Sequence, residues 1–434
     1  MTKASGIESR RAALRILEGA RNGRPFDGAL GRSVAGLPEP DRRLAHELAA
    51  GVLRQRSVLD ERLAPLVPRG WASVAVELQD ILRLGAYQLT ALERVPVHAA
   101  VDTSVTLAKD AGGIKAAGFV NAVLRRLTRS DPPSAVAGPK DATALAAEYS
   151  HPQWLVRRWV EQFGVDGAEA LLRWNNARPR LTAQAARADL ETLRDRWRAS
   201  GIEVEPAPFG AGLQVNLTRP ADLPGYGEGA FVVQNPAQAL LARFAELEEG
   251  AEVYDACAAP GGKTIALGSS AGSVVAGDIS RARSRRLKKN VERAGSGREH
   301  VVVADARYPA VRPVDAVLLD TPCLGTGTFA RHPDARWRVQ PEHLTSLVRL
   351  QAELLDCAAE VVAPGGLLLY STCSIEPEEN RAQVDQFLAR HTEFRRESPS
   401  RFPGELLSPE GDLMVLPQQH GMDGAYAARL RRTP

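Results

Sequence analysis

The feature that most constrains the fold is a regular alternation of apolar, strand-like runs with helical segments, which begins near residue 250. The strand-like runs lie near 252–256, 273–278, 300–304, 314–319 and 366–371. The helical segments lie near 262–268, 281–294, 342–362 and 377–390. Alternation of this kind is typical of a parallel sheet covered by helices. It predicts an α/β, doubly wound, Rossmann-like domain.

Each predicted strand ends at, or is soon followed by, a polar or reactive residue. These residues are Asp255, Asp278, Asp305, Asp320 and Cys373. In a doubly wound sheet the loops beyond the carboxyl ends of the strands share one edge, and ligands bind there. Because the long helix near 342–362 is predicted to be a crossover, Cys323 should emerge on the same side as Cys373.

The 434 residues are too many for one ordinary core. Apolar positions recur at helical spacing from residue 7 to about 130, and 131–139 has the proline and glycine content of a linker. We therefore predict an all-helical domain at 1–135 and the α/β domain at 241–434. Between them, 145–240 is predicted to hold linker helices and a small α+β subdomain.

Composition places the chain among soluble globular proteins, with 44% hydrophobic and 25% charged residues. No apolar run approaches the roughly 18 to 20 residues needed to span a bilayer. The N-terminus has no apolar core of the kind found in signal peptides. We expect a cytoplasmic protein that is a monomer and has no membrane partner.

The four cysteines are Cys257, Cys323, Cys357 and Cys373. No two have the spacing of metal ligands and no histidines cluster near them, so we expect no metal. Disulfides are not expected in a reducing compartment. We interpret Cys357 and Cys257 as core residues. The other two lie at the functional edge of the sheet, where a thiol with a lowered pKa can act as a nucleophile.

The loop after the first strand ends in Gly262-Lys263-Thr264, as phosphate-binding loops do. Such loops need a glycine five positions before Gly262, where this chain has Cys257. A Gly-Gly turn still permits close backbone approach and directs helix N–H groups at an anionic group. Asp278 and Asp305 alone would be read as helix caps or turn residues. Together, at successive strand ends, they favour an adenosine cofactor without a polyphosphate.

A thiol nucleophile and an adenosine cofactor are both needed for methylation at carbon 5 of a pyrimidine. That carbon becomes nucleophilic only after a thiolate adds to carbon 6. The adduct must then lose its carbon-5 proton to a base, and the two thiols and Asp320 supply these parts. The chemistry alone does not say which thiol attacks.

Several strings resemble the motifs of the RNA 5-methylcytosine methyltransferase family. They lie at 255–264, 320–327, 331–334 with Trp337, 371–374 and 376–380. The helical front end is similar to the NusB-like RNA-binding domain. That pairing of domains is typical of the bacterial Sun/Fmu (RsmB-type) enzymes that modify 16S ribosomal RNA.

The resemblance implies S-adenosylmethionine as cofactor and RNA, specifically 16S ribosomal RNA, as partner. It implies that Cys373 is the nucleophile, that Cys323 assists release, and that Asp320 also holds the target cytosine. The cofactor-binding residues that it implies are Cys257, Ala258, Ala259, Pro260, Gly261, Gly262, Lys263, Asp278, Asp305 and Asp320. Two positions depart from the family pattern, Asn235 in place of aspartate and Ala425 in place of phenylalanine.

Two alternatives remain open from the sequence. The same chemistry on transfer RNA is one, and a non-catalytic RNA-binding factor with an α/β scaffold is the other. In either case RNA can contact the helical domain, the 177–235 segment or the basic run at 281–289. A target base must be taken out of its stack before it can react.

Overall fold

A computed structural model describes residues 3–130, 140–216, 219–309 and 311–434. The predicted linker at 131–139 lies outside these residues. The chain divides into two compact units, which are described separately. The helical unit is Met1–Ala177 with Phe329–Val339, and the α/β unit is Arg178–Thr328 with Gln340–Pro434.

Two features are absent from the described residues. None of the helices in these ranges is both long and apolar enough to cross a bilayer. The same ranges contain no group of three or more His, Cys, Asp or Glu side chains arranged to hold a metal ion.

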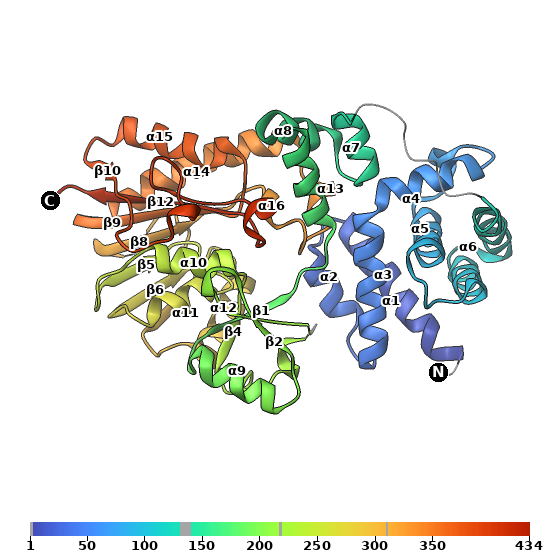
Figure 1. Cartoon of the computed structure of the whole chain (residues 1–434), viewed down its shortest axis with the longest axis horizontal. Helices are drawn as coiled ribbons and strands as arrows, with labels where there is room; N and C mark the ends of the chain where they lie inside the picture. Colours follow the sequence, from blue (N-terminus) through green and yellow to red (C-terminus); the bar gives the residue numbers. More distant parts are fainter. Residues whose placement is uncertain (1–2, 131–139, 217–218, 310) are drawn as a thin grey trace. The chain divides into compact units, whose positions relative to one another are not determined.

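The helical unit has the all-helical architecture that the sequence predicts (Figure 1). Its main helices are α1 (Lys3–Arg21), α2 (Phe26–Ser33), α3 (Glu39–Arg54), α4 (Arg56–Leu63), α5 (Val76–Ala91), α6 (Val97–Leu127), α7 (Ala142–Glu148) and α8 (Gln153–Asn176). Apolar side chains at helical spacing, such as Ile16, Leu48 and Ile81, fill one core. Pro96 is the N-cap residue of α6, a position that suits proline because it has no backbone N–H to donate to the helix.

The segment Phe329–Val339, which follows the Cys323 loop in the sequence, belongs to the helical unit. It contains the short helix α13 (Ala335–Arg338). The Trp337 indole N–H donates to the Leu53 carbonyl at 2.7 Å, and the fully buried Arg336 donates to the Asn175 carbonyl at 2.7 Å. The sequence gives no local sign of this arrangement, because it depends on contacts between residues nearly three hundred positions apart.

A small antiparallel sheet opens the α/β unit, with strand order β2-β3-β1-β4. The strands are β1 (Leu181–Ala185), β2 (Val204–Pro206), β3 (Leu213–Val215) and β4 (Phe231–Val233), joined by helix α9 (Leu190–Ala199). Trp197 of α9 is buried edge-on against Phe231, with ring centroids 5.1 Å apart. The sequence predicts a small α+β subdomain in this region. The strands β2 and β4 are too short to show a periodicity.

The larger sheet has the strand order β10-β12-β9-β8-β5-β6-β7, with β11 paired to β12. Its parallel strands are β5 (Glu252–Asp255), β6 (Ser273–Gly277), β7 (Glu299–Val302), β8 (Val314–Asp320) and β9 (Val362–Thr372). All five confirm predicted strands. The antiparallel strands β10 (Phe394–Arg396), β11 (Leu413–Val415) and β12 (Ala425–Arg432) make the sheet mixed and were not predicted.

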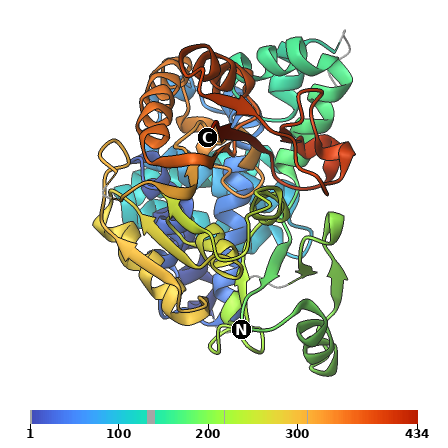
Figure 2. The same ribbon diagram turned by 90° about the vertical axis from the view of Figure 1, so that its left-hand side faces the viewer.

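Helices cover both faces of this sheet (Figures 1 and 2). They are α10 (Pro236–Phe244), α11 (Gly262–Gly268), α12 (Arg281–Ala294), α14 (Pro341–Glu360) and α15 (Arg381–Arg390). Successive strand side chains point to opposite faces. Leu318 and Leu369 therefore pack with α10, whereas Leu319 and Tyr370 pack with α14. This layering directs the loops that follow β5, β6, β7, β8 and β9 to one edge.

Candidate functional site

The parallel register of β8 and β9 brings the two thiols together. Asp320 lies opposite Ser371, so the residues that follow each strand leave the sheet side by side. The Sγ atoms of Cys323 and Cys373 are 3.4 Å apart, although 50 positions separate them in the sequence. The Gly327 N–H also donates to the Cys373 carbonyl at 3.1 Å. The predicted meeting of these two loops is confirmed.

The Cys323 thiol is placed to keep its proton. Its hydrogen bond with Cys373, its burial and the nearby charges of Cys373 and Glu379 together raise the pKa of Cys323 well above the usual value. An ionised sulfur at this position would lack a compensating positive charge. These surroundings favour the protonated form of Cys323.

Asp320 connects the first loop with the thiols. Lys263 Nζ donates to Asp320 Oδ2 at 2.6 Å, and Ser371 Oγ donates to Asp320 Oδ1 at 2.8 Å. The Lys263 side chain is 12% exposed and that of Asp320 is 28% exposed, so this ion pair is partly screened from water. Both partners reach the edge of the sheet at which the thiols lie.

The first loop is held by its neighbours and leads directly into α11. The Ala256 N–H donates to the Leu318 carbonyl at 2.9 Å, and the Ala258 N–H to the Gly277 carbonyl at 2.8 Å. Gly261 has φ +104°, and a Cβ there would lie 2.6 Å from Leu287 Cδ1. Only glycine meets both conditions at this turn. The N-terminus of α11 then points its free N–H groups at the loop.

The Cys257 side chain packs with the apolar layer around Tyr254 and Val317. Burial raises its pKa to about 12, so it remains a protonated thiol. The interpretation of Cys257 as a core side chain agrees with this packing. Its backbone remains part of the loop beside the α11 N-terminus.

The carboxylates of Asp278 and Asp305 differ in the number of hydrogen bonds that they accept from neighbouring residues. Asp278 is 3% exposed and accepts from Ser280 N–H and Arg283 Nε through Oδ1, while Oδ2 accepts no hydrogen bond from the described residues. Both oxygens of Asp305 accept from Arg307, which lowers the pKa of Asp305. The Arg307 backbone N–H also donates to Oδ1 at 3.0 Å, so Asp305 already accepts four hydrogen bonds, about the number that a carboxylate can accept.

Apolar side chains lie exposed beside these two aspartates. Ile279 directly follows Asp278 and is 56% exposed, and Val303 is 55% exposed. Sequence reasoning did not assign a role to either residue. The signal that could have found them is an apolar residue next to a strand-end aspartate, where a solvated loop would normally carry a polar one.

Asp255, at the end of β5, is a buried carboxyl group whose pKa makes the stability of the protein depend on pH. It is 1% exposed, and Thr264 Oγ1 donates to its Oδ2 at 2.7 Å. Burial raises its pKa to about 7, against a normal value near 4. Between these values the folded protein binds more protons than the unfolded chain, so Asp255 loses its stabilising contribution as the pH rises from about 4 through about 7.

We therefore expect the melting temperature of Asp255→Asn, relative to the parent, to increase between about pH 5 and about pH 8. Differential scanning calorimetry at a series of pH values measures this difference. A difference that stays constant across that range would contradict the assignment.

Gly327, Gly424 and the start of β12 support the two loops that carry Cys323 and Cys373. The Gly424 N–H donates to the Gly327 carbonyl at 2.8 Å, and a Cβ on Gly327 would lie 2.6 Å from Gly424 Cα. Ala425, one of the two positions that differ from the family pattern, is buried and pairs with Val415 of β11. Asn235, the other such position, caps the N-terminus of α10, since its Oδ1 accepts the Ala237 N–H at 2.9 Å. Both substituted positions make ordered supporting contacts.

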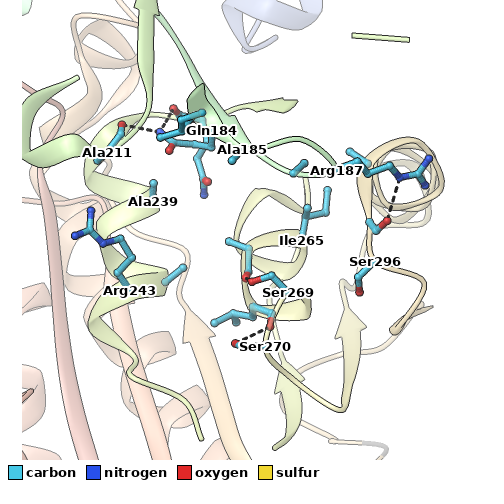
Figure 3. Close-up of a pocket in the computed structure, with 18 of the residues that line it drawn as sticks. Gln184, Ala185, Arg187, Ala211, Ala239, Arg243, Ile265, Ser269, Ser270 and Ser296 are labelled. Carbon is cyan, nitrogen blue, oxygen red and sulfur yellow. Dashed lines mark hydrogen bonds between the residues drawn. The ribbon is translucent and has the colours of Figure 1, made fainter. Parts of the chain in front are cut away.

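A cavity of about 960 Å³ lies elsewhere in the α/β unit, between β1, α10, α11 and the turn after α12 (Figure 3). Gln184, Arg187, Arg243 and Ser270 are among the residues that line it. None of the site residues predicted from the sequence is in its lining. This cavity therefore does not coincide with the candidate site, which lies at the edge of the sheet that carries the two thiols.

The doubly wound sheet, with its loops gathered at one edge, places the α/β unit in the class of Rossmann-like methyltransferases. Three family models match the chain: the NusB family over 7–129, a RsmF/B-like ferredoxin-like domain over 151–222, and the 16S rRNA methyltransferase RsmB/F over 242–431. The chain belongs to the RsmB/F family of 16S ribosomal RNA methyltransferases.

Full-length relatives support this membership. A probable ribosomal RNA small subunit methyltransferase B of Synechocystis is 33% identical over 98% of this chain and 100% of its own. The ribosomal RNA small subunit methyltransferase B of Thermus thermophilus is 36% identical over 96% of both chains. The crystal structure of PH0851 matches with a TM-score of 0.84 and 25% identity, and covers 98% of this chain and 99% of that one.

Proposed function

We propose that this protein transfers a methyl group from S-adenosylmethionine to carbon 5 of a cytosine in 16S ribosomal RNA, through a covalent adduct between Cys373 and carbon 6. The observation that carries the proposal is the 3.4 Å approach of the Cys323 and Cys373 sulfurs at the ligand-binding edge of the sheet. Family membership supports methyl transfer to ribosomal RNA. The two thiols support the cytosine chemistry.

The residues at this edge fit S-adenosylmethionine. Loop 257–263 offers a tight turn and the N-terminus of α11, and the free Oδ2 of Asp278 can accept a ribose hydroxyl. Ile279 and Val303 offer apolar surface to a ring, and Asp305 would accept an adenine amine in exchange for one of its contacts with Arg307. Asp320, with Lys263, completes the predicted cofactor set. When bound, the cofactor supplies an electrophilic methyl group.

In this proposal the two thiols have different roles, one in attack on the ring and one in release. Cys373 is the sulfur that attacks as a thiolate, the role that the resemblance to the 5-methylcytosine methyltransferases implies, and Cys323, whose pKa burial and the Cys373 contact raise, is the S–H donor. Its lone pair forms the Sγ–C6 bond, and the electrons of the C5–C6 double bond make carbon 5 nucleophilic. Asp320, held by Lys263 and Ser371, accepts a hydrogen bond from the cytosine and fixes its orientation.

Release reverses the addition after the methyl group has arrived. Carbon 5 loses its proton to a base, for which the site offers Asp320. The C5–C6 double bond reforms as the Sγ–C6 bond breaks and its electron pair returns to Cys373. The Cys323 S–H, 3.4 Å away, donates a hydrogen bond to the departing sulfur and stabilises its charge.

The test is to incubate the purified protein with methyl-labelled S-adenosylmethionine and 16S ribosomal RNA from cells that lack the gene. Nucleoside analysis should place the label in 5-methylcytidine, and bisulfite sequencing should identify the position. Label in another nucleoside would overturn the proposal, and label only in transfer RNA from the same cells would support that alternative substrate. No heat of S-adenosylmethionine binding by calorimetry, with tight RNA binding, would support a non-catalytic factor.

RNA contact along α12 is part of the proposal. This helix exposes Arg281, Arg285, Arg286, Lys288 and Lys289 on one surface. Replacing Arg285 and Lys289 by glutamine should weaken RNA binding and flatten its salt dependence by about 0.7 to 0.9 in log–log slope for each lost phosphate contact. Filter binding at several KCl concentrations measures the slope. Exposed Arg349 and Arg395, changed to glutamine, provide the charge-matched control. Equal slopes for both pairs would exclude α12.

We further propose that methyl transfer is carried out by 241–434 and that 1–135 and 145–240 serve RNA recognition, in a cytoplasmic monomer. The match of the RsmB/F model to 242–431 supports the first boundary. Light scattering coupled to size-exclusion chromatography measures the oligomeric state, and a dimer mass would contradict the monomer.

A further inference from the structure

The carboxylate of Glu379 lies directly behind the two thiols. It is completely buried, and its Oε1 accepts the Leu324 N–H at 3.0 Å and Gln351 Nε2 at 2.9 Å. The Ser374 hydroxyl lowers the pKa of this carboxylate, and the residue after Glu379, Asn380, donates to the Ser374 carbonyl at 2.9 Å. Leu324 directly follows Cys323, and Ser374 directly follows Cys373. One side chain therefore joins the residues next to both sulfurs.

Burying the Glu379 carboxylate costs free energy of folding that apolar packing would not. Burial raises the pKa of Glu379, while the bonds from Ser374, Gln351 and Leu324 lower it. Replacing a buried charged group and its partners by apolar residues is often neutral or stabilising for a fold. Stability alone therefore gives no reason for a carboxylate at this point. A requirement for fixed geometry between the two loops does give one.

The two loops also meet directly, through Thr326 Oγ1 with Ser374 Oγ at 3.1 Å and the Gly327 N–H with the Cys373 carbonyl at 3.1 Å. Those contacts lie beyond Gly325, whereas Glu379 holds Leu324, next to Cys323. The Glu379 carbonyl accepts the Tyr370 hydroxyl at 2.6 Å, so the residue is anchored to β9 through its backbone. Neighbouring Asn380 accepts Thr372 Oγ1 at 2.6 Å and donates to the Ser374 carbonyl at 2.9 Å. These contacts fix the Cys373 side. The Leu324 N–H bond extends that support to the Cys323 side.

We propose that Glu379 is a positioning residue for the methyl-transfer reaction: it holds the Cys323 loop against the Cys373 loop, so that Cys323 can act on the departing sulfur. The inference rests on the proposed roles of the two thiols. Glu379 is buried and acts through Leu324 and Ser374, without contact to RNA or cofactor. Its loss should slow release more than attack, because Cys373 keeps its own anchors.

Glu379→Gln is the variant that tests this role. The amide can keep its oxygen at Oε1 for Leu324 and Gln351, but its NH2 group then replaces Oε2, which accepts from the Leu324 N–H at 3.3 Å, so a donor faces a donor there. We expect release of the RNA adduct to slow by about tenfold, the size of effect that losing one buried hydrogen bond to a charged group produces. Adduct formation should remain close to that of the parent.

The experiment is a quenched time course with 16S ribosomal RNA and S-adenosylmethionine, resolved on denaturing gels. The variants are Glu379→Gln, Cys323→Ala, the double variant, and Glu299→Gln, a buried glutamate that is bonded to Ser296 and Gly297 away from the thiols. We expect adduct to accumulate in the first three and not in the fourth. The double variant should release no more slowly than Cys323→Ala, because both changes remove the same assistance.

Three results would overturn the inference: release at the parent rate in Glu379→Gln, loss of adduct formation in that variant, or a double variant in which the two effects multiply. Adduct that fails to accumulate in Cys323→Ala would instead contradict the proposed role of Cys323. If Glu379→Gln does not fold, Glu379→Asp serves in its place. It keeps the charge but is one methylene too short to reach both loops, so the same slow release is expected.

Discussion

Replacing Cys373 by alanine is expected to abolish both methyl transfer and the covalent RNA adduct. Without the thiolate, carbon 5 of cytosine is not a nucleophile, and no other described sulfur takes the place of Cys373 at the end of β9. We expect the rate to fall by more than about a thousandfold, as for other nucleophile deletions. Transfer of labelled methyl groups and a denaturing gel measure the two effects.

The matched control for this prediction is Cys357→Ala. Cys357 lies on α14 and burial raises its pKa, so it is expected to be a structural thiol whose loss leaves activity close to that of the parent. Calorimetry should show that Cys373→Ala still binds S-adenosylmethionine. Equal activity of Cys373→Ala and the parent would reject covalent catalysis by this residue.

Replacing Cys323 by alanine is expected to have the opposite effect on the adduct, which should accumulate. Attack by Cys373 needs no group from Cys323, whereas the departing sulfur loses the S–H donor 3.4 Å away. Turnover should fall while a protein–RNA band that survives denaturation grows with time. Protease treatment should convert that band back to free RNA.

The same pair of variants ranks the two thiols. If Cys323 were the nucleophile, Cys323→Ala would show no adduct and Cys373→Ala would accumulate it. If neither variant changed adduct or turnover, both sulfurs would be packing residues and the proposed chemistry would fail. The expected ranking, with Cys373 as nucleophile, follows from the resemblance to the 5-methylcytosine methyltransferases, and the raised pKa of the buried Cys323 is consistent with its role as a donor.

Much of the α/β unit follows from local patterns. The runs that became β5, β6, β7, β8 and β9 are apolar because both faces of a parallel strand are covered, and each ends where the chain leaves the core. This rule alone places Asp278, Asp320 and Cys373 at one edge. It also predicts the meeting of Cys323 and Cys373, since neighbouring parallel strands end together.

Other features carried no local signal. Strand β12 reads Ala425-Tyr426-Ala427-Ala428-Arg429-Leu430 and lies inside the sheet, where the buried Arg429 donates to the Phe244 carbonyl at 3.1 Å. A charged residue in such a run argues against a central strand. The long-range hydrogen bond that satisfies it cannot be read from neighbours in the sequence.

The sequence by itself determined the class of fold, the edge of the sheet that carries the chemistry and the residues gathered there, because strand and helix periods are local properties. Only the tertiary structure decided the 3.4 Å spacing of the sulfurs, the burial that raises the pKa of Cys323 and the bridge made by Glu379. Only it placed Phe329–Val339 with the helices. Distances and proton affinities depend on groups far apart in the chain, and packing alone brings those groups together.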